Sequence, residues 1–452
     1  MNNASVFKFG IVGGGCIGQE HIRNISVLEN ATVAAVCDPH EKSRQQCEGL
    51  VAKFKMGNVK FVADHKELLA MPDLDGIIIA TPNHTHFQVI KDAFAAKVKS
   101  MLVEKPLCIT VEECKEVLDL VEANPDTMFW VGMEYRYIPS VDRLISEVHR
   151  GSIGSVKMLS IREHRFPFLR KVGNWNRFKE NTGDTLVEKC CHFFDLMLHI
   201  VASKPIRVFG SGGQDVNHLD ESYDGKKSNI LDNAFVIVDF EGGQRACLDI
   251  CMFAEASKNQ EEICVVGDAG KVEACAPAHG AKAIDVDIPN FVIGRVDPST
   301  RRRRAESDDQ PPAPVVPEAS HIEIDERLME VGAHCGATYY ELEAFVFAAR
   351  HGEAAQVDAL DGALAVALGV AAHRSIDEKR IVEMSELEVD KYWELRHRKH
   401  TKPLRQRGTM SGANSYSESL QNLANLATAL PSDGVKHLQQ DGWDMALRAD
   451  DQ

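Results

Sequence analysis

The feature that most constrains this chain is a glycine-rich turn between two apolar runs near its start. The run at 6–12 leads into Gly13, Gly15 and Gly18, which have the spacing Gly-x-Gly-x-x-Gly. Asp38 closes a second apolar run, twenty residues after Gly18. This is the context that a dinucleotide-binding strand–turn–helix requires. The sequence therefore predicts such a unit, with a dinucleotide bound at the turn.

Each part of the turn has its own physical task. Gly13 allows the tight turn, Gly15 lets a pyrophosphate approach the backbone, and Gly18 lets the following helix pack close to the sheet. A helix is predicted at 17–29, and free N–H groups and the positive end of the helix dipole at its start favour phosphate, so we expect Cys16 and Ile17 to contact the cofactor.

Asp38 predicts which dinucleotide binds. Its carboxylate would accept hydrogen bonds from the two ribose hydroxyls and repel a 2′-phosphate, so we expect NAD rather than NADP. The alternative is a glycine-rich turn without a ligand. The strand before the turn, the helical pattern after it and Asp38 together favour the cofactor.

Composition narrows the class of protein. A chain of 452 residues suits two domains. Its net charge of -16 argues against binding to nucleic acid or a membrane surface, because both are anionic. No apolar run approaches the ~20 residues that span a bilayer, and residues 1–5 lack the pattern of a signal peptide. We expect a cytoplasmic protein.

The cysteines predict neither disulfides nor a metal site. Most of the twelve lie inside apolar patterns, which is typical of reduced core cysteines. Cys190 and Cys191 precede His192, but adjacent residues cannot easily bind one ion together, and no C-x-x-C pair accompanies them. We therefore expect no metal.

The pattern of apolar residues divides the chain into two domains. Up to residue 133, apolar runs alternate with amphipathic stretches, which predicts a parallel sheet with helices on both faces. From about residue 154 a period of two appears, which predicts antiparallel strands interrupted by one long helix at 185–202. We therefore predict an α/β chain with a Rossmann domain at 1–133 and an α+β domain at 134–400, which has a large open, mostly antiparallel sheet.

Three further segments complete the predicted organisation. The Arg- and Pro-rich stretch at 296–318 could form a basic nucleic-acid patch, but a solvated insertion loop is the favoured interpretation. A helix at 360–376 could pack back on the first domain. Residues 401–452 contain few large apolar side chains and many polar ones, which predicts a mobile tail.

The end of the fourth predicted strand carries the first candidate site segment. Thr81, Pro82, Asn83 and His86 follow this strand, where ligands of a parallel sheet bind. We expect them to contact the ribose and nicotinamide of the cofactor. The alternative is a helix cap made by Asn83 or Thr85, and the two interpretations are compatible.

The second candidate segment is Glu104-Lys105-Pro106, at the end of the fifth predicted strand. Lys105 and Glu104 would lie beside the nicotinamide. Burial and the positive nicotinamide ring would lower the pKa of Lys105, and Glu104 would oppose that shift. The alternative is a lysine that faces solvent.

The third candidate segment lies in the long predicted helix. Glu188, His192 and Asp195 are spaced i, i+4 and i+7, so one helical face would carry all three and Glu188 could contact His192 directly. A carboxylate beside an imidazole raises its basicity, as a general base needs. The alternative is an ordinary structural pair.

Taken together, these residues resemble the glucose–fructose oxidoreductase/inositol dehydrogenase (Gfo/Idh/MocA) family over about residues 6–385. The resemblance rests on the nucleotide turn, Glu104-Lys105-Pro106, Tyr135-Arg136-Tyr137, Gly151-x-Ile153-Gly154 and the acid four residues before His192. It implies that His192 accepts the hydroxyl proton of a sugar or polyol while hydride moves to NAD, and that Lys105 stabilises the oxygen. The family commonly has Asp where this chain has Glu188.

The resemblance also suggests where the substrate binds and how the chain assembles. Polar and aromatic residues of the second domain suit a polyol, although a sheet edge and a surface loop would explain most of them. It implies a homodimer or homotetramer through the open sheet face of the second domain. The expected substrate contacts are Arg136, His164, Arg165, Trp175, Arg177, Glu188, His192 and Tyr339.

Two other functions stay open at this point. A glycoside hydrolase of the same fold could retain NAD and oxidise its sugar transiently. A non-catalytic sensor could bind the dinucleotide and a partner protein. The presence of both Lys105 and His192 favours the dehydrogenase.

Overall fold

The computed structural model describes residues 6–277, 289–296, 315–332 and 334–400. Residues 1–393 form one compact unit, which contains the candidate site, and residues 394–452 form a second. Most of the predicted insertion at 296–318 and all of the predicted tail at 401–452 lie outside the described residues.

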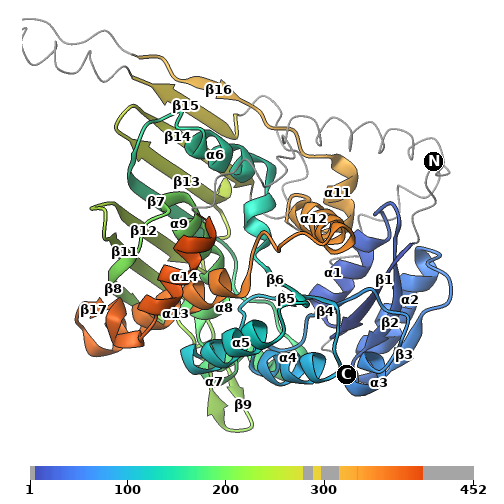
Figure 1. The fold of residues 1–452 in the computed structure, drawn as a ribbon. Helices are drawn as coiled ribbons and strands as arrows, with labels where there is room; N and C mark the ends of the chain where they lie inside the picture. The colour runs from blue at the N-terminus through green and yellow to red at the C-terminus, as the bar shows by residue number, and fades with distance from the viewer. Residues whose placement is uncertain (1–5, 278–288, 297–314, 333, 401–452) are drawn as a thin grey trace, which may run out of the picture. The chain divides into compact units, whose positions relative to one another are not determined.

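The first sheet is parallel throughout and has the strand order β3-β2-β1-β4-β5-β6. This confirms the predicted Rossmann-like fold (Figure 1). Its strands are β1 (Phe7–Val12), β2 (Ala31–Cys37), β3 (Lys60–Val62), β4 (Gly76–Ile79), β5 (Ser100–Glu104) and β6 (Met128–Gly132). The helices between them are α1 (Cys16–Ile25), α2 (Glu41–Lys53), α3 (His65–Leu69), α4 (His86–Ala95) and α5 (Val111–Ala123).

Both faces of this sheet are buried, which explains the continuous apolar runs of its strands. Phe9 and Ile11 of β1 belong to one hydrophobic cluster, and Val12 belongs to another. The first cluster includes residues of α12 (Ala337–His351), which packs against α1 although more than 300 residues separate the two helices (Figure 1). The C-terminal part of the chain therefore helps to complete the first domain.

The second sheet has nine strands in the order β16-β15-β14-β13-β7-β12-β11-β8-β17. It is mostly antiparallel, as predicted, but β7 and β12 pair in parallel. Its strands are β7 (Val156–His164), β8 (Pro205–Gly213), β11 (Asn233–Phe240), β12 (Arg245–Cys251), β13 (Asn259–Gly267), β14 (Gly270–Pro277), β15 (Phe291–Arg295), β16 (Glu318–Ser320) and β17 (Val382–Glu383). A separate small hairpin joins β9 (Ser222–Tyr223) and β10 (Lys226–Lys227).

The two faces of the nine-stranded sheet differ. Helices contact one face: α6 (Pro139–His149) contacts β14, α9 (Cys191–Val201) contacts β7, and α13 (Ala359–Glu378) contacts β8. The side chains of β11 alternate between buried and exposed, and Phe235 and Ile237 lie on the exposed side. The remaining helices among the described residues are α7 (Lys179–Thr182), α8 (Thr185–Glu188), α11 (Glu326–Val331) and α14 (Asp390–His400), with 3₁₀ turns η1 (Asn83–Thr85), η2 (Glu134–Tyr137), η3 (Val172–Arg177) and η4 (Met384–Leu387).

Helix α13 joins the two sheets. It contacts α5 and β6 of the first domain and α9 and β8 of the second. Among the described residues, it is the one helix that is long and apolar enough to cross a membrane. However, 78% of its apolar 18-residue stretch is buried inside the protein. Its apolar character is therefore explained by packing, as in the core helix of a globular domain.

The prediction of a single long helix at 185–202 is wrong in one respect. The segment forms two helices, α8 and α9, and the helical pattern is interrupted at Lys189 and Cys190 between them. Asp184 caps the first turn of α8 with its carboxylate, and Ala202 ends α9 in the left-handed region at φ 50° and ψ 35°. The interruption changes which side chains of this segment meet.

Candidate active site

The nucleotide turn has the geometry that its glycines predict. Gly13 has φ +104°, and a side chain there or at Gly18 would overlap backbone atoms of Ala80 or Gly13. A Cβ added at Gly15 would meet no atom within 4 Å. Gly13 and Gly18 are therefore required by packing, whereas Gly15 leaves space beside the backbone that a pyrophosphate could fill.

Helix α1 begins directly after this space. Gly15 is its N-cap, and no side chain caps its first turn. The first amides of the helix, at Cys16 and Ile17, therefore have no capping side chain to compete with a phosphate. The residues present fit a dinucleotide at this turn.

Asp38 stands where a ribose-binding acid is expected, at the carboxyl end of β2. Its Oδ2 accepts a hydrogen bond from the Gly14 amide (2.8 Å), and its Oδ1 accepts one from the His40 amide (2.8 Å). The two amides hold the carboxylate against the glycine turn, and each oxygen keeps further lone pairs for a ligand.

The segment after β4 serves two different tasks. The amide nitrogen of Asn83 donates a hydrogen bond to a carboxylate oxygen of Glu188, so Asn83 does not cap a helix and instead connects the two domains. The two ring nitrogens of His86 lie 2.9 Å from the carbonyl oxygens of Pro106 and Thr81, and the side chain is fully buried. His86 was predicted to contact the cofactor, but its ring nitrogens are engaged by the backbone.

Glu104 and Lys105 end β5 and are held in different ways. Oε1 of Glu104 lies 2.6 Å from Nε2 of His21, a fully buried side chain of α1. The Lys105 ammonium donates to the backbone carbonyl of Glu188 (3.0 Å) and lies 3.8 Å from its carboxylate. The peptide bond between Lys105 and Pro106 is cis. Lys105 is thus directed toward the second domain and away from solvent.

The predicted direction of the Lys105 pKa shift is wrong for the protein alone. Burial lowers the pKa of Lys105, but the negative charges of Glu188 and Glu104 outweigh burial, and the net shift is upward. Lys105 is therefore a stable ammonium, which suits a group that stabilises negative charge on an oxygen.

His192 lies at the start of α9 and is 2% exposed. Burial, and then the positive charges of Lys105 and Lys189, hold the pKa of His192 well below its usual value. The imidazole is therefore neutral near pH 7 and able to accept a proton. The predicted contact between Glu188 and His192 is replaced, because the interruption after α8 pairs Glu188 with Asn83 and Lys105.

Tyr135 connects His192 to a buried charged network. Its ring stacks on the His192 ring, with centroids 4.1 Å apart and an interplanar angle of 8°. Its hydroxyl donates to Glu261 (3.0 Å) and accepts from the Lys189 ammonium (2.6 Å), which also lies 3.0 Å from Glu163. Burial and the charge of Glu163 raise the pKa of Glu261 to about 7. The sequence predictions included neither Tyr135, Lys189, Glu163 nor Glu261 as site residues.

Three of the predicted substrate contacts are structural instead. Arg136 is buried in a bidentate pair with Asp195 (2.6 and 2.5 Å). Arg177 is also buried and donates to Glu221 (3.1 Å). Tyr339 belongs to a small hydrophobic cluster with side chains of α11. An arginine or tyrosine held in this way has little freedom to bind a polyol.

The other predicted substrate residues lie at the end of β7 and in the loop after it. His164 pairs with Asp249 of the neighbouring strand (3.1 Å) and is part-exposed. Arg165 lies 3.5 Å from the Glu163 carboxylate, and its charge acts on His192. Trp175 meets His84 edge-on, with ring centroids 6.2 Å apart, so it connects η3 with η1. Of these three, Arg165 is the one whose charge acts on His192. We call the side chains grouped around His192 the chamber: Lys105, Tyr135, Arg165, Lys189 and His334.

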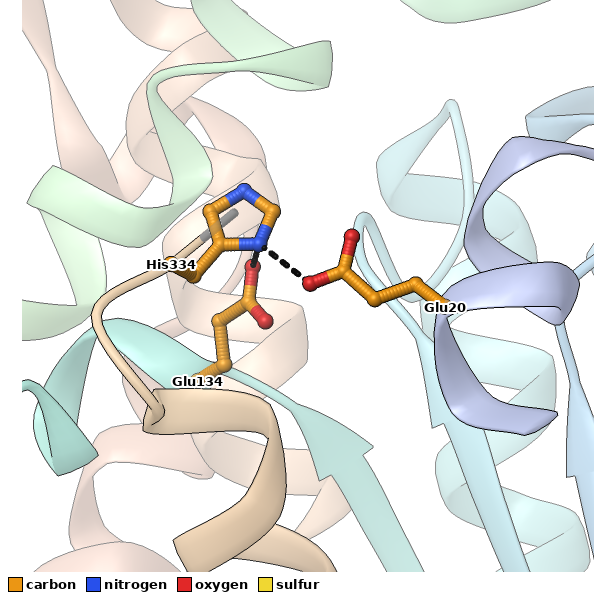
Figure 2. Close-up of side chains that lie close together, drawn as sticks. All are labelled: Glu20, Glu134 and His334. Carbon is orange, nitrogen blue, oxygen red and sulfur yellow. Dashed lines mark hydrogen bonds and ion pairs between the residues drawn. The ribbon is translucent and has the colours of Figure 1, made fainter. Parts of the chain in front are cut away.

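A second buried cluster lies beside Tyr135. Figure 2 shows Nδ1 of His334 directed toward Glu20 of α1 (3.0 Å) and Glu134 of η2 (3.4 Å). The Thr338 hydroxyl lies within hydrogen-bond distance of both carboxylates. Burial lowers the pKa of His334, but the two carboxylates outweigh burial and raise it to about 9. The three ligand atoms are close enough to hold a metal ion, and a protonated His334 satisfies the same carboxylates without one.

These two clusters have little signal in the sequence. Their members come from α1, η2, β7, the α8–α9 junction, β13 and the segment before α12. The one local signal is the run Lys189-Cys190-Cys191, because a lysine inside an otherwise apolar segment calls for a buried partner. The partners themselves, Glu163 and Tyr135, follow only from the tertiary structure.

Comparison with known proteins identifies the family. A model of the oxidoreductase family with an NAD-binding Rossmann fold matches residues 7–133, and a model of the family's C-terminal alpha/beta domain matches residues 145–384. The chain belongs to the Gfo/Idh/MocA oxidoreductase family. The resemblance found in the sequence is therefore confirmed, and residues 7–133 form an NAD-binding Rossmann domain.

Relatives within the family include dehydrogenases of inositol. The chain is 24% identical over 382 residues to the myo-inositol 2-dehydrogenase of Thermotoga maritima, covering 84% of this chain and 99% of that protein. It is 28% identical over 287 residues to an uncharacterized oxidoreductase, YrbE, of Bacillus subtilis, covering 63% of this chain and 77% of that protein. At these identities the shared property is the oxidoreductase family.

Solved structures share the fold. The scyllo-inositol dehydrogenase of Lactobacillus casei, solved with NAD(H) and scyllo-inositol, has a TM-score of 0.62 and 18% identity, covering 84% of this chain and all of that chain. An oxidoreductase domain protein from Kribbella flavida has a TM-score of 0.68 and 17% identity, with the same coverage. At this level of identity the likeness concerns the fold alone.

Proposed function

We propose that this family member is an NAD-dependent dehydrogenase that oxidises a secondary alcohol of a cyclic polyol or sugar. The observation that carries the proposal is the pairing of two groups at the domain junction. His192 is buried and neutral, and the part-buried Lys105 ammonium, held by Glu188, acts on it with its charge. A proton acceptor and a fixed positive charge are the two groups that oxidation of an alcohol needs from the protein.

The two side chains divide the reaction between them. His192 accepts the hydroxyl proton as the carbon–hydrogen bond breaks. Lys105 stabilises the negative charge that develops on the same oxygen. Glu188, which accepts a hydrogen bond from Asn83, holds the ammonium at the domain junction. Bound NAD would supply the hydride acceptor at C4 of its nicotinamide. The products are the ketone, NADH and the proton left on His192.

The substrate class rests on relatives and on the site together. Relatives of this chain are named inositol dehydrogenases, and the charge of Arg165 and the ammonium of Lys105 act on His192. Lys105, Glu188 and Arg165 are the described residues that we propose to contact a polyol. Stereochemistry is set by positions of about an ångström, so a panel of substrates is needed to determine it.

The residues that we propose to bind NAD begin with those of the nucleotide turn. Gly13, Gly15 and Gly18 shape it, the amides of Cys16 and Ile17 face the phosphates, and Asp38 binds the ribose. Thr81, Pro82, Glu104 and Lys105 lie at the strand ends toward the nicotinamide. We propose NAD over NADP because the Asp38 carboxylate would repel a 2′-phosphate.

The direct test is the appearance of NADH in the presence of a polyol. NAD and NADP would each be tested with myo-inositol, scyllo-inositol, glucose, galactose and xylose, and calorimetry would measure binding of each cofactor. Turnover with NAD on one substrate supports the proposal. Tight NAD binding with no net NADH from any substrate contradicts it and favours a hydrolase that retains NAD, or a sensor.

We also propose that the chain forms a homodimer or homotetramer through the open face of the nine-stranded sheet. This face exposes Phe235 and Ile237 of β11, with Phe209 of β8 and Met158 of β7. Paired strands place Ile237 opposite Phe209, so the exposed apolar groups are neighbours. An apolar face of this kind favours coverage by a second copy. Light scattering that shows only a 50 kDa monomer would contradict this proposal.

A further inference from the structure

His192 has an unusual support for a general base. Its Nδ1 is buried, and among the residues that the structure describes it has no hydrogen-bond partner. In catalytic histidines the second ring nitrogen commonly donates to a carboxylate or carbonyl, which fixes the plane and the tautomer. Here the described contact that defines the plane of the ring is the parallel stack with Tyr135.

Tyr135 is itself held at both its ring and its hydroxyl. The hydroxyl lies between the Lys189 ammonium (2.6 Å) and Glu261 (3.0 Å), so it accepts from one and donates to the other. The same ammonium lies 4.7 Å from the centroid of the Tyr135 ring. Lys189 therefore fixes the position of Tyr135 through a hydrogen bond and a cation–π contact.

Lys189 is a costly residue to bury: burial holds its pKa below the ordinary value, and Glu163 offsets this in part. The side chain is 4% exposed, and its ammonium lies 3.0 Å from Glu163, which is fully buried. Oε2 of Glu163 has no hydrogen-bond partner among the described residues. A buried pair of this kind seldom stabilises a protein more than apolar packing would, which favours a role in the site.

The charges around His192 come from four parts of the chain. Lys105 follows β5, Lys189 lies between α8 and α9, Arg165 follows β7, and His334 precedes α12. All four oppose a positive charge on the imidazole. Several acidic groups are paired with these cations: Glu188 with Lys105, Glu163 with Lys189 and Arg165, and Glu134 and Glu20 with His334. Glu261, from β13, accepts the Tyr135 hydroxyl proton in a hydrogen bond.

We propose that Tyr135 and Lys189 are positioning residues for His192. Tyr135 sets the plane of the imidazole by stacking, and Lys189 fixes Tyr135 and supplies a positive charge that keeps the imidazole unprotonated. The inference rests on the proposed role of His192 as the base. It adds that Lys189, held by Glu163, helps burial and Lys105 to determine the pH at which the base becomes active, although we do not propose that Lys189 contacts the substrate oxygen.

The test uses the full-length protein with ¹³C-labelled histidine, followed by NMR as the pH is changed. The His192 signal is assigned by its loss in His192→Gln. Lys189→Met should raise the apparent protonation constant of His192 about tenfold, equal to one pKa unit. Lys189→Arg should leave it near the wild-type value, and Lys157→Met, which removes an exposed lysine of β7, is the matched control.

Tyr135 variants give a second and independent readout. The stacked ring shifts the His192 signal by its ring current, so Tyr135→Leu should abolish that shift, whereas Tyr135→Phe should retain it. Tyr135→Phe also removes the hydroxyl that holds Lys189, and should raise the protonation constant by a smaller factor than Lys189→Met. If Lys189→Met does not fold, the two tyrosine variants still decide the stacking role.

The outcomes separate this inference from the proposed function. Unchanged His192 titration in Lys189→Met, or an unchanged His192 shift in Tyr135→Leu, overturns the inference. If the titration moves as expected but no polyol is oxidised by the wild-type protein, the positioning is correct and the proposed reaction is wrong. Where a substrate is found, the acid limb of kcat/KM should move to higher pH in Lys189→Met, with KM little changed.

Discussion

The nucleotide turn and the chamber around His192 are built in opposite ways. The turn takes all its groups from residues 6–38, one continuous stretch in which each glycine has a backbone task. The chamber takes its groups from the ends of β5 and β7, from η2, from the α8–α9 junction and from the segment before α12. The first is a local structure that the sheet supports, and the second exists only when two domains have packed together.

This difference explains which predictions succeeded. In the turn, the spacing of residues determines the distance between their atoms, because a short stretch of covalent chain joins them. In the chamber, the sequence singled out Lys105 and His192, whose catalytic roles stay predictions, but it did not indicate their partners. Glu188 was paired with His192 in the prediction and is bonded to Asn83 and Lys105 in the structure.

The largest expected effect compares His192 and Lys105 with His164, which the sequence assigned to the substrate. His192→Gln and Lys105→Met should each lower kcat/KM by about 10²–10⁴-fold, because each removes a group that acts on the reacting oxygen. His164→Gln should change it by less than about threefold, since His164 pairs with Asp249. Steady-state kinetics on the identified substrate measures all three. An equal loss in His164→Gln would show that the site extends along β7.

The next effect distinguishes Gly18, which packing requires, from Gly15, which leaves space for a ligand. Gly18→Ala should cost about 2–3 kcal/mol of the free energy of unfolding, because the new Cβ would overlap the Gly13 carbonyl. Gly15→Ala should change stability by less than about 0.5 kcal/mol yet weaken NAD binding at least about tenfold. Urea unfolding and calorimetry measure the two quantities. Normal NAD binding by Gly15→Ala would place the pyrophosphate elsewhere.

A pH-dependent effect is expected at the His334 cluster. The folded-state pKa of His334, about 9, lies above the ordinary value of 6.5, so the ion pairs with Glu20 and Glu134 stabilise the protein below pH 6.5. This contribution, of about 3 kcal/mol, is lost as the pH rises through 9. The stability difference between wild type and His334→Gln should therefore shrink over that range. His351→Gln, an exposed histidine of α12, is the control. A difference independent of pH would contradict the assignment.

The smallest effect tests the end of helix α9, which carries His192. Ala202 has left-handed backbone angles, a conformation that costs a residue with a Cβ about 1 kcal/mol. Ala202→Gly should stabilise the protein by up to about that amount. Ala96, the C-cap of α4, has right-handed angles, so Ala96→Gly should give no gain. Urea unfolding compares the two. A gain in both variants would point to an effect unrelated to backbone angle.

Much of the fold could be predicted from the sequence. The alternation of strands and helices predicted up to residue 133 is the one that the first domain has, because buried parallel strands leave continuous apolar runs. The period-two runs of the second domain likewise predicted its central strands. The parallel pairing of β7 with β12 could not be predicted, since strand direction leaves no mark on the alternation of side chains.

Arg136, Arg177 and Tyr339 show where prediction of the site ended. Each has a side chain that suits a polyol, and each is committed to a partner distant in the sequence: Arg136 to Asp195, Arg177 to Glu221 and Tyr339 to the side chains of α11. The type of a residue indicates what its side chain can bind. The residues around it in the fold determine whether its polar and apolar groups already have partners.

By itself, the sequence determined the nucleotide turn and the Rossmann domain, because these depend on local spacing and on backbone freedom at glycine. It also singled out Lys105 and His192 as candidates. Only the tertiary structure decided that Glu188 holds Lys105, that Tyr135 stacks on His192 and that Lys189 is paired with Glu163. These contacts join segments that lie far apart along the chain. Electrostatic and packing energies depend on distance in space, which local patterns of residues do not encode.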